Sequence, residues 1–407
     1  MAEYITGMNP AIIKWARERS GYSLEEAAAV IKKDVATLSA WESGGSAPTY
    51  VQLEKLAGKY KRPVAIFFFP EPPEEPDIAG NLARQSSENT PISPRMHSLL
   101  RQAYARQISL MELNLGVNPM RKKIFRELQA QPDDVASELA RKTRVYLDVS
   151  IDTQLGWRNT KAALENWQDI VDREGIFVFK EAFRDDSVDG FCITHEEFPV
   201  IYLNNSSPLV RQIFSLFHEL AHLLLGENGM TRGDFIRGGD IEDFCNQFAA
   251  EFLVPDLDLE TRLTFSAYDD DAIETLANQY KVSRPIILLK LVNRGILTRE
   301  DYAQKIEGWT AERGTYERKK SAGKMPMLMS SGPEPSFHEL KDVNAKPSGR
   351  RRYYKTRATY LGYRFMELAF SKYHQGQCSI EQLAEHLDVK VEDLPELENN
   401  LLRKADN

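Results

Sequence analysis

The sequence predicts an α+β protein that is mostly helical. Short helical segments with capping residues and tight turns fill the first 70 residues. From Ile170 the pattern changes to short runs of β-branched and aromatic residues, typical of strands, and after Asn204 it returns to helical spacing. We therefore expect an N-terminal five-helix domain, a small central sheet beside two helices, and a C-terminal helical domain.

Length and composition set the number of domains. A chain of 407 residues exceeds what one hydrophobic core usually organises, and 42% hydrophobic residues supply enough material for two to four cores. Changes of pattern predict six segments: 1–75 (five-helix domain), 76–150 (helical connector), 151–260 (central domain), 261–313 (helical extension), 314–349 (flexible linker) and 350–407 (C-terminal helical domain).

Charge and apolar runs argue against two classes of protein. The formal net charge of −8 argues against a surface devoted wholly to nucleic acid, although a local basic face is allowed. No apolar run reaches the length of a membrane span, and the N-terminus MAEYITGMNP lacks a secretory pattern, so we expect a cytoplasmic protein with no membrane partner. Three widely spaced cysteines (Cys192, Cys245 and Cys378) suit a reducing compartment.

The first segment has the spacing of a helix-turn-helix. Ser23 can cap a helix from Leu24, Asp34 can cap the next from Val35, and glycines follow that helix. A generic small helical bundle is the alternative, but it leaves the order of caps and turns unexplained. Through LEEAAAVI, LSAWESG and APTYVQLEKLA, about 70 residues resemble the XRE class of phage-repressor-like domains.

The resemblance implies that a recognition helix reads bases, and it places the reading positions here on Val35, Ala36, Thr37 and Ala40. Direct readout needs Arg, Lys, Asn or Gln, so base-specific reading is expected to be weak.

Phosphate or partner contacts are expected from Lys32, Lys33 and Thr37. Residues 1–70 carry nine basic and seven acidic side chains, a net of +2 that is modest for a DNA module. Binding to DNA and docking onto another protein therefore both stay open as uses of this domain.

Three strand-like runs precede a helix that carries polar residues in an apolar run. The runs are GIFVFKEAF, SVDGFCIT and PVIYLN, and the helix contains FSLFHELAHLLLG, with Ser207 as its expected cap and Gly226 as its stop. His218 and His222 lie one turn apart, so both imidazoles can reach one cation, while Glu219 is rotated toward a water on it. The alternative is two buried histidines that are satisfied by local hydrogen bonds.

The next helix, DIEDFCNQFAAEFLVP, is the expected source of a third ligand. A catalytic zinc takes three protein ligands and keeps a fourth position open. Glu242 is our choice over Asp243 and Glu251, and Asn246, four residues later, suits a hydrogen bond to a ligand. Cys245 could ligate, but a lone cysteine on an apolar helix face is more often a small core residue.

Through FSLFHELAHLLLG and IEDFCNQFAAEFLVP, residues 150–260 resemble the ImmA/IrrE family of metallopeptidases. The resemblance implies a minimal zincin core with Zn2+ bound by His218, His222 and Glu242, and Glu219 as general base. It also implies a strand edge beside the active-site helix, which we place on PVIYLN.

The sequence leaves the oxyanion partner unassigned. His195 and Tyr202 lie on the strand-like segments before the helix and are candidates only.

A pattern recurs three times along the chain: SLEEAAAVIKKDVATL, AIETLANQYKVSRPII and SIEQLAEHLDVKVEDL. Three helix-turn-helix-like units are expected, although any short two-helix hairpin gives a similar outline.

The segment RRRYYKTRATYLGYRF begins the C-terminal domain. Its basic and aromatic residues could hold nucleic acid or an acidic partner, or form a solvated helix start with tyrosines in the core.

These features favour a zinc-dependent endopeptidase that cleaves a repressor-like regulatory protein to control transcription. The alternative is a transcriptional regulator or antitoxin-like protein that binds DNA or a toxin and uses the peptidase domain as sensor or scaffold. A housekeeping peptidase of broad specificity fits less well, because recognition domains flank the core.

Overall fold

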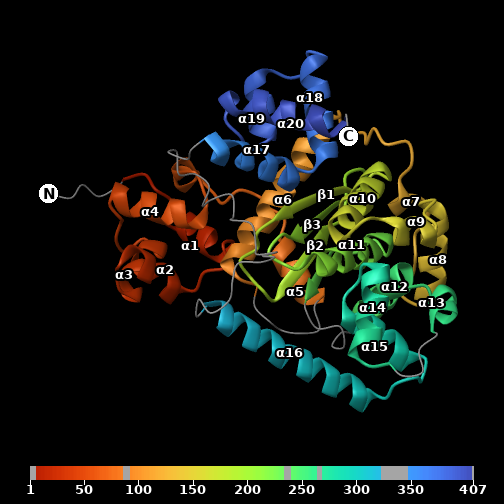
Figure 1. Ribbon diagram of the computed structural model, residues 1–407. Coiled ribbons are helices and arrows are strands. Elements are labelled where there is room, and N and C mark those ends of the chain that lie inside the picture. Colours follow the sequence, from red (N-terminus) through yellow and green to blue (C-terminus); the bar gives the residue numbers. More distant parts are fainter. Residues whose placement is uncertain (1–5, 86–91, 233–239, 264–267, 322–346, 406–407) are drawn as a thin grey trace. The chain divides into compact units, whose positions relative to one another are not determined.

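The computed structural model describes residues 6–85, 92–232, 240–263, 268–321 and 347–405 (Figure 1). The chain folds into two compact units. One comprises residues 1–105 with 183–185, and the other comprises residues 106–182 with 186–407. The six expected segments stay predictions as domain boundaries.

The regular elements described in the first unit are all helices. Its elements are α1 (Pro10–Glu18), α2 (Leu24–Ile31), α3 (Val35–Glu42), α4 (Tyr50–Tyr60), the 3₁₀ helix η1 (Val64–Phe68), α5 (Ile78–Gln85) and the start of α6 (Pro94–Leu113). Four α-helices and one 3₁₀ helix thus make up the expected five-helix domain. Their apolar faces meet in one core around Leu38, Trp41 and Leu53.

Capping side chains fix where α2 and α3 begin. Ser23 Oγ accepts a hydrogen bond from Glu26 N, and Glu26 Oε2 accepts one from Ser23 N, which is a reciprocal capping box. Asp34 accepts from Thr37 N at 2.7 Å. Such caps each stabilise a helix by about 1 kcal/mol. The predicted helix-turn-helix is confirmed at the residues that the sequence indicated.

The second unit contains a mixed four-stranded sheet. Its strands are β1 (Phe177–Glu181), β2 (Val188–Ile193), β3 (Val200–Asn204) and β4 (Gly229–Arg232), in the order β1-β3-β2-β4. β1 pairs parallel to β3, whereas β2 pairs antiparallel to both β3 and β4. The three strands that were predicted are confirmed, and β4 is an addition.

The placement of the sheet edge on PVIYLN was wrong. β3 hydrogen-bonds to β1 on one side and to β2 on the other, so both of its edges are paired. The strand at the end of the described sheet on the side of β2 is β4.

The two faces of the sheet pack differently. Ile201 and Leu203 belong to the core that includes α11, and Gly190 lies against Ser215 of that helix. Because side chains alternate along a strand, Tyr202 points to the opposite face, where it contacts Phe179 and Phe191.

Helices around the first face supply most of the core (Figure 1). They are α7 (Ile124–Glu127), α8 (Ala136–Tyr146), α9 (Ile151–Gly156), α10 (Thr160–Arg173), α11 (Leu209–Leu224), α12 (Asp240–Leu253) and α13 (Asp256–Arg262). Trp167 of α10 meets Phe217 of α11 and Phe252 of α12, and the two phenylalanine rings stack 4.0 Å apart. This aromatic cluster holds α11 and α12 against each other.

The remaining helices follow the central part. They are α14 (Asp270–Tyr280), α15 (Arg284–Asn293), α16 (Arg299–Ser321), α17 (Pro347–Leu361), α18 (Tyr363–His374), α19 (Ile380–His386), the 3₁₀ helix η2 (Val391–Asp393) and α20 (Leu394–Ala405). Both ends of the expected linker are helical, because α16 continues to Ser321 and α17 begins at Pro347. Its middle, 322–346, lies outside the described residues. No described helix is long and apolar enough to cross a bilayer.

The three repeated patterns form comparable turns. Each places a residue with a left-handed backbone at the tenth position of its pattern: Lys32 (φ 54°), Lys281 (φ 60°) and Asp388 (φ 51°). A non-glycine residue with positive φ is uncommon, so three at one position support a shared turn geometry. The helix-turn-helix is matched for the first unit alone, at residues 13–67, and for the other two it stays a prediction; in the last one η2 precedes the second helix.

Candidate metal centre

The helix α11 presents its two histidines in a fixed and buried position. Its C-terminal turn ends at Gly226 (φ +74°), where Glu227 N donates to His222 O and Gly226 N donates to Leu223 O. This pairing satisfies carbonyls that a helix end would leave open. The sequence predicts Ser207 as the cap of this helix, and that prediction is wrong. The Ser207 hydroxyl hydrogen-bonds to Asp189 instead.

Four ligand atoms converge at the centre. His218 Nε2 and His222 Nε2 lie 3.2 Å apart. The Glu242 carboxylate from α12 approaches both, with Oε2 3.2 Å from His218 Nε2 and Oε1 3.4 Å from His222 Nε2. Both histidines are buried, whereas the Glu242 side chain keeps 26% of its surface exposed.

These separations fit a zinc ion. Two atoms that are each about 2.0–2.1 Å from one ion in tetrahedral geometry lie roughly 3.3 Å apart. The two imidazole nitrogens and the carboxylate oxygens stand within 0.2 Å of that spacing. Asn246 Oδ1 lies 2.9 Å from His218 Nδ1, where it can accept that N–H and leave Nε2 for a cation. Among the described residues, His222 Nδ1 has no such partner.

Electrostatics favour an ionised Glu242. Burial alone would raise the pKa of this carboxyl, but its hydrogen bonds to His218 and His222 hold the pKa well below its usual range. The other two acids considered for this role lie elsewhere. Asp243 is exposed, and Glu251 pairs with Lys290 of α15.

The strand β4 holds Glu219. Glu219 Oε1 accepts from Thr231 N at 2.8 Å and from Thr231 Oγ1 at 2.5 Å, whereas no described residue is a hydrogen-bond partner of Oε2. β4 approaches α11 closely at Gly229, where a Cβ would stand 2.3 Å from a His222 ring carbon and 2.7 Å from Glu219 Oε2. Only glycine fits this approach without a shift.

Cys245 also belongs to this cluster. One ligand atom each from His218, His222 and Cys245 lies within 4.8 Å of the other two, and all three residues are buried. The expectation of a small core residue is correct in one respect, since Cys245 packs in the main core. Its sulfur also lies near the two histidines, and its spacing of three residues from Glu242 on one helix is the sequence signal for this placement.

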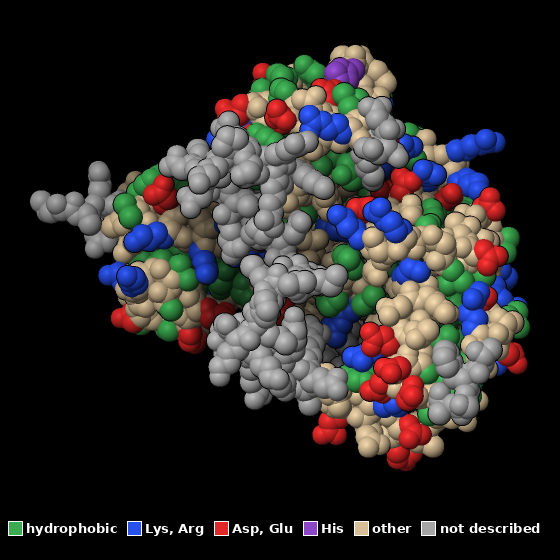
Figure 2. Space-filling view, viewed as in Figure 1, with side chains coloured by type: hydrophobic (Ala, Val, Ile, Leu, Met, Phe, Trp, Pro, Cys, Tyr) green, Lys and Arg blue, Asp and Glu red, His purple; other side chains and the backbone are tan. Residues whose placement is uncertain are grey.

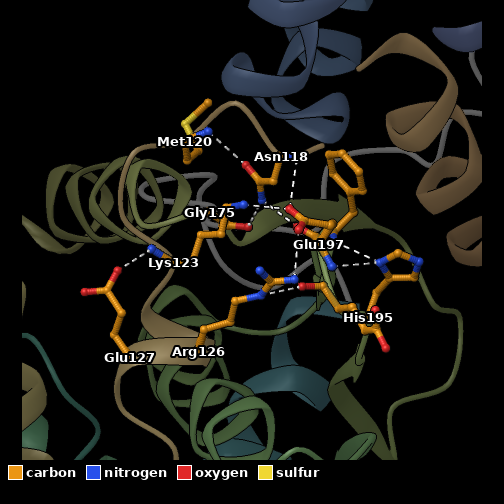
Figure 3. A network of polar contacts seen from close by, with 10 residues as sticks. Asn118, Met120, Lys123, Arg126, Glu127, Gly175, His195 and Glu197 are labelled. Atoms are coloured by element: carbon orange, nitrogen blue, oxygen red, sulfur yellow. Dashed lines mark hydrogen bonds and ion pairs between the residues drawn. The ribbon is translucent and has the colours of Figure 1, made fainter. Parts of the chain in front are cut away.

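The two candidates for an oxyanion partner have other surroundings. His195 Nδ1 accepts from Glu197 N at 3.0 Å and from Phe198 N at 3.1 Å. Figure 3 shows this turn joined to Asn118 and Glu197, and Glu197 also pairs with Arg126. Burial lowers the pKa of His195. His195 thus stabilises the turn before β3.

Tyr202 lies on the sheet face opposite α11. Burial raises its pKa to about 12. Its side chain therefore points away from the histidines.

The helix-turn-helix exposes the residues that its resemblance indicated. Lys32 and Lys33 lie exposed in the turn between α2 and α3, and Ala36 is exposed on α3, where Thr37 and Ala40 are half-buried. Val35 keeps 37% of its surface exposed to solvent. On the face in Figure 2, Lys and Arg over the N-terminal helices stand among apolar and acidic side chains rather than in one patch.

The basic C-terminal segment is partly structural. Arg357 is buried and its Nη2 donates to the carbonyls of Leu387 and Asp388 at 2.7 Å each. This arginine is therefore a core residue that holds α17 against the turn after α19. The side chains of Arg350, Arg351, Arg352 and Lys355 lie outside the described part.

The pair of helix-borne histidines beside a small sheet is the arrangement of a metallopeptidase. Comparison with protein families agrees. An IrrE N-terminal-like domain of the peptidase class matches residues 171–292, and a helix-turn-helix matches residues 13–67. The chain therefore carries an IrrE N-terminal-like metallopeptidase domain behind an N-terminal XRE-type helix-turn-helix, the class of domain that binds DNA. Comparison with curated proteins gives no match.

Proposed function

We propose that this chain is a zinc-dependent endopeptidase that cleaves a repressor-like regulatory protein and so controls transcription. The observation that carries the proposal is the convergence of His218, His222 and Glu242 at separations of 3.2–3.4 Å. The regulatory part is supported by the helix-turn-helix, because it puts a recognition module in the same chain as the peptidase domain.

The residues divide the work of peptide hydrolysis. A zinc ion held by His218, His222 and Glu242 would lower the pKa of a water molecule and polarise a peptide carbonyl. Glu219 would take the proton of that water at Oε2, the oxygen that Thr231 leaves open, and pass it to the leaving amine. An extended substrate segment would pair with β4, the strand at the end of the sheet next to α11.

Metal content gives the first test. Purified wild type should carry about one zinc per chain, and His222→Ala or Glu242→Ala should lower the occupancy. Glu219→Gln should keep it, as should Asp243→Ala, a matched control for an exposed acid on the same helix. Equal zinc in all five proteins by elemental analysis would remove the assigned ligand set.

Cleavage gives the second test. With a peptide library made from a bacterial proteome, mass spectrometry should detect new termini after incubation with zinc-loaded wild type. Glu219→Gln should lower the rate by about 10²–10⁴, the loss expected for a positioned general base, with zinc content and circular dichroism unchanged. Cleavage by Glu219→Gln at the wild-type rate would contradict the role of Glu219.

A transcriptional regulator that uses the peptidase domain as scaffold is the second candidate, favoured by the helix-turn-helix match. If the peptidase domain is only a scaffold, the Glu219→Gln protein should keep its effect in cells on the target operon or on a neighbouring toxin. A peptidase loses that effect.

A further inference from the structure

Cys245 stands where a metal ligand would stand. It follows Glu242 by three residues and precedes Asn246 on α12, so one face of this helix carries all three toward α11. The two histidines and Cys245 offer ligand atoms that all lie within 4.8 Å of one another, and all three residues are buried. A thiolate and an imidazole on one tetrahedral zinc lie roughly 3.6 Å apart, so a shift of about 1 Å suffices.

The other cysteines lack this placement. Cys192 is buried on β2, and its thiol donates to Glu227 O at 3.8 Å. It does not belong to the cluster of ligand atoms found among the described residues, and burial together with the nearby Glu219 carboxylate raises the pKa of its thiol. Cys378 lies half-buried between α18 and α19. The chain therefore offers a buried neighbouring thiol as a matched control.

A fourth protein ligand changes what such a centre can do. Zinc sites with four protein ligands are closed and structural, whereas catalytic sites hold three and keep one position for water. His218, His222 and Glu242 already supply three.

We propose that Cys245 is a fourth ligand of this centre and that its thiolate keeps the peptidase latent by occupying the position of the catalytic water. This inference rests on the proposed metallopeptidase function. Cys245 gives up its proton to bind and takes a proton back when it leaves. Water then enters the position beside Glu219, with no change in oxidation state and no bond to carbon made or broken.

The test uses the full chain loaded with zinc or with Co2+. X-ray absorption at the zinc edge should find one sulfur at about 2.3 Å in wild type and in Cys192→Ala. In Cys245→Ala and Cys245→Ser it should find only nitrogen and oxygen near about 2.0–2.1 Å. With Co2+ in place of zinc, wild type and Cys192→Ala should show a sulfur-to-cobalt charge-transfer band, and the two Cys245 variants should lack it. Circular dichroism checks that all four proteins fold.

A kinetic arm tests latency. If the thiolate leaves the coordination position of the catalytic water free for about a tenth of the time, Cys245→Ala should cleave the proteome-derived peptide library about tenfold faster than wild type. Equal rates for the two would overturn the latent state.

The possible results distinguish failure of the Cys245 proposal from failure of the metallopeptidase proposal. Wild type that binds zinc through nitrogen and oxygen alone overturns the role of Cys245 and leaves the proposed peptidase standing. Sulfur that persists in both Cys245 variants overturns it too. Wild type that binds no metal removes the metallopeptidase proposal and this one together.

Discussion

At the scale of single residues, Thr231 decides how Glu219 is oriented. Its backbone N–H and its hydroxyl both donate to Oε1, which leaves Oε2 available for the proton transfer that we propose. A carboxylate that is held by two donors cannot rotate freely within its buried site. Thr231 is therefore a positioning residue, since it acts on the reaction only through Glu219.

Thr231→Val should lower kcat with little change in KM or zinc content. Removing a hydrogen bond to a charged group costs about 1.5–3 kcal/mol, which corresponds to roughly 10–100-fold in rate. Thr231→Ser restores the hydroxyl and should recover most of the loss. The measurement is steady-state cleavage of one peptide taken from the library. A fall in KM alone, or no rescue by serine, would show that the threonine only supports packing.

The residues of the centre differ in how far the sequence indicates them. His218, Glu219 and His222 are evident because their spacing maps directly onto one helix face. Glu242 follows from the need for a third ligand. Thr231 carries no signal, since nothing in a sequence tells which distant hydroxyl meets a buried carboxylate. Cys245 carries an ambiguous signal, because a buried thiol serves a core and a metal equally well.

At the scale of elements, β4 shapes the centre through one close approach to α11. Gly229 has no Cβ, and one placed there would overlap the His222 ring and Glu219 Oε2. β4 escaped prediction because its four residues, GMTR, show no alternation and follow a glycine turn. The sequence also did not predict the position of β3 between β1 and β2, since the order of strands in a sheet depends on long-range pairing. α11 and α12 were predictable from their helical periodicity.

Gly229→Ala should weaken zinc binding by displacing His222 or β4. A contact of 2.3 Å to a ring carbon cannot be kept, and losses of about 10–100-fold in metal affinity accompany misplaced ligands in other sites. Competition with a chelator of known affinity measures the change. Gly308→Ala on α16, where an added Cβ meets nothing within 4 Å, is the matched control and should leave affinity unaltered. Identical affinities for both variants would mean that β4 adapts without cost.

At the scale of the whole molecule, the chain joins a peptidase domain to an N-terminal helix-turn-helix. The repeat was predictable because caps and small residues recur at a fixed spacing, and the left-handed residues at Lys32, Lys281 and Asp388 fit it. The extent of the linker was not predictable, because helices α16 and α17 reach into segments whose composition is typical of loops. Composition reports average preference, whereas a long helix can extend through several poor formers.

The last prediction concerns how the N-terminal helix-turn-helix binds DNA. The positions on α3 that the resemblance assigns to base reading are Val35, Ala36, Thr37 and Ala40, and among them only the half-buried Thr37 carries a hydroxyl for base edges. The groups suited to phosphate are Lys32 and Lys33, which stand exposed in the preceding turn.

Affinity should therefore fall steeply with salt and depend little on sequence. In fluorescence anisotropy titrations at several salt concentrations, Lys32→Ala or Lys33→Ala should reduce the slope of log affinity against log salt by about 1. Lys14→Ala, which removes an exposed lysine from α1, should leave the slope unchanged. Tight binding of wild type to one operator in the presence of excess bulk DNA at physiological salt would contradict this account. It would mean that small apolar groups and one threonine on α3 read sequence through methyl contacts or through the shape of the DNA.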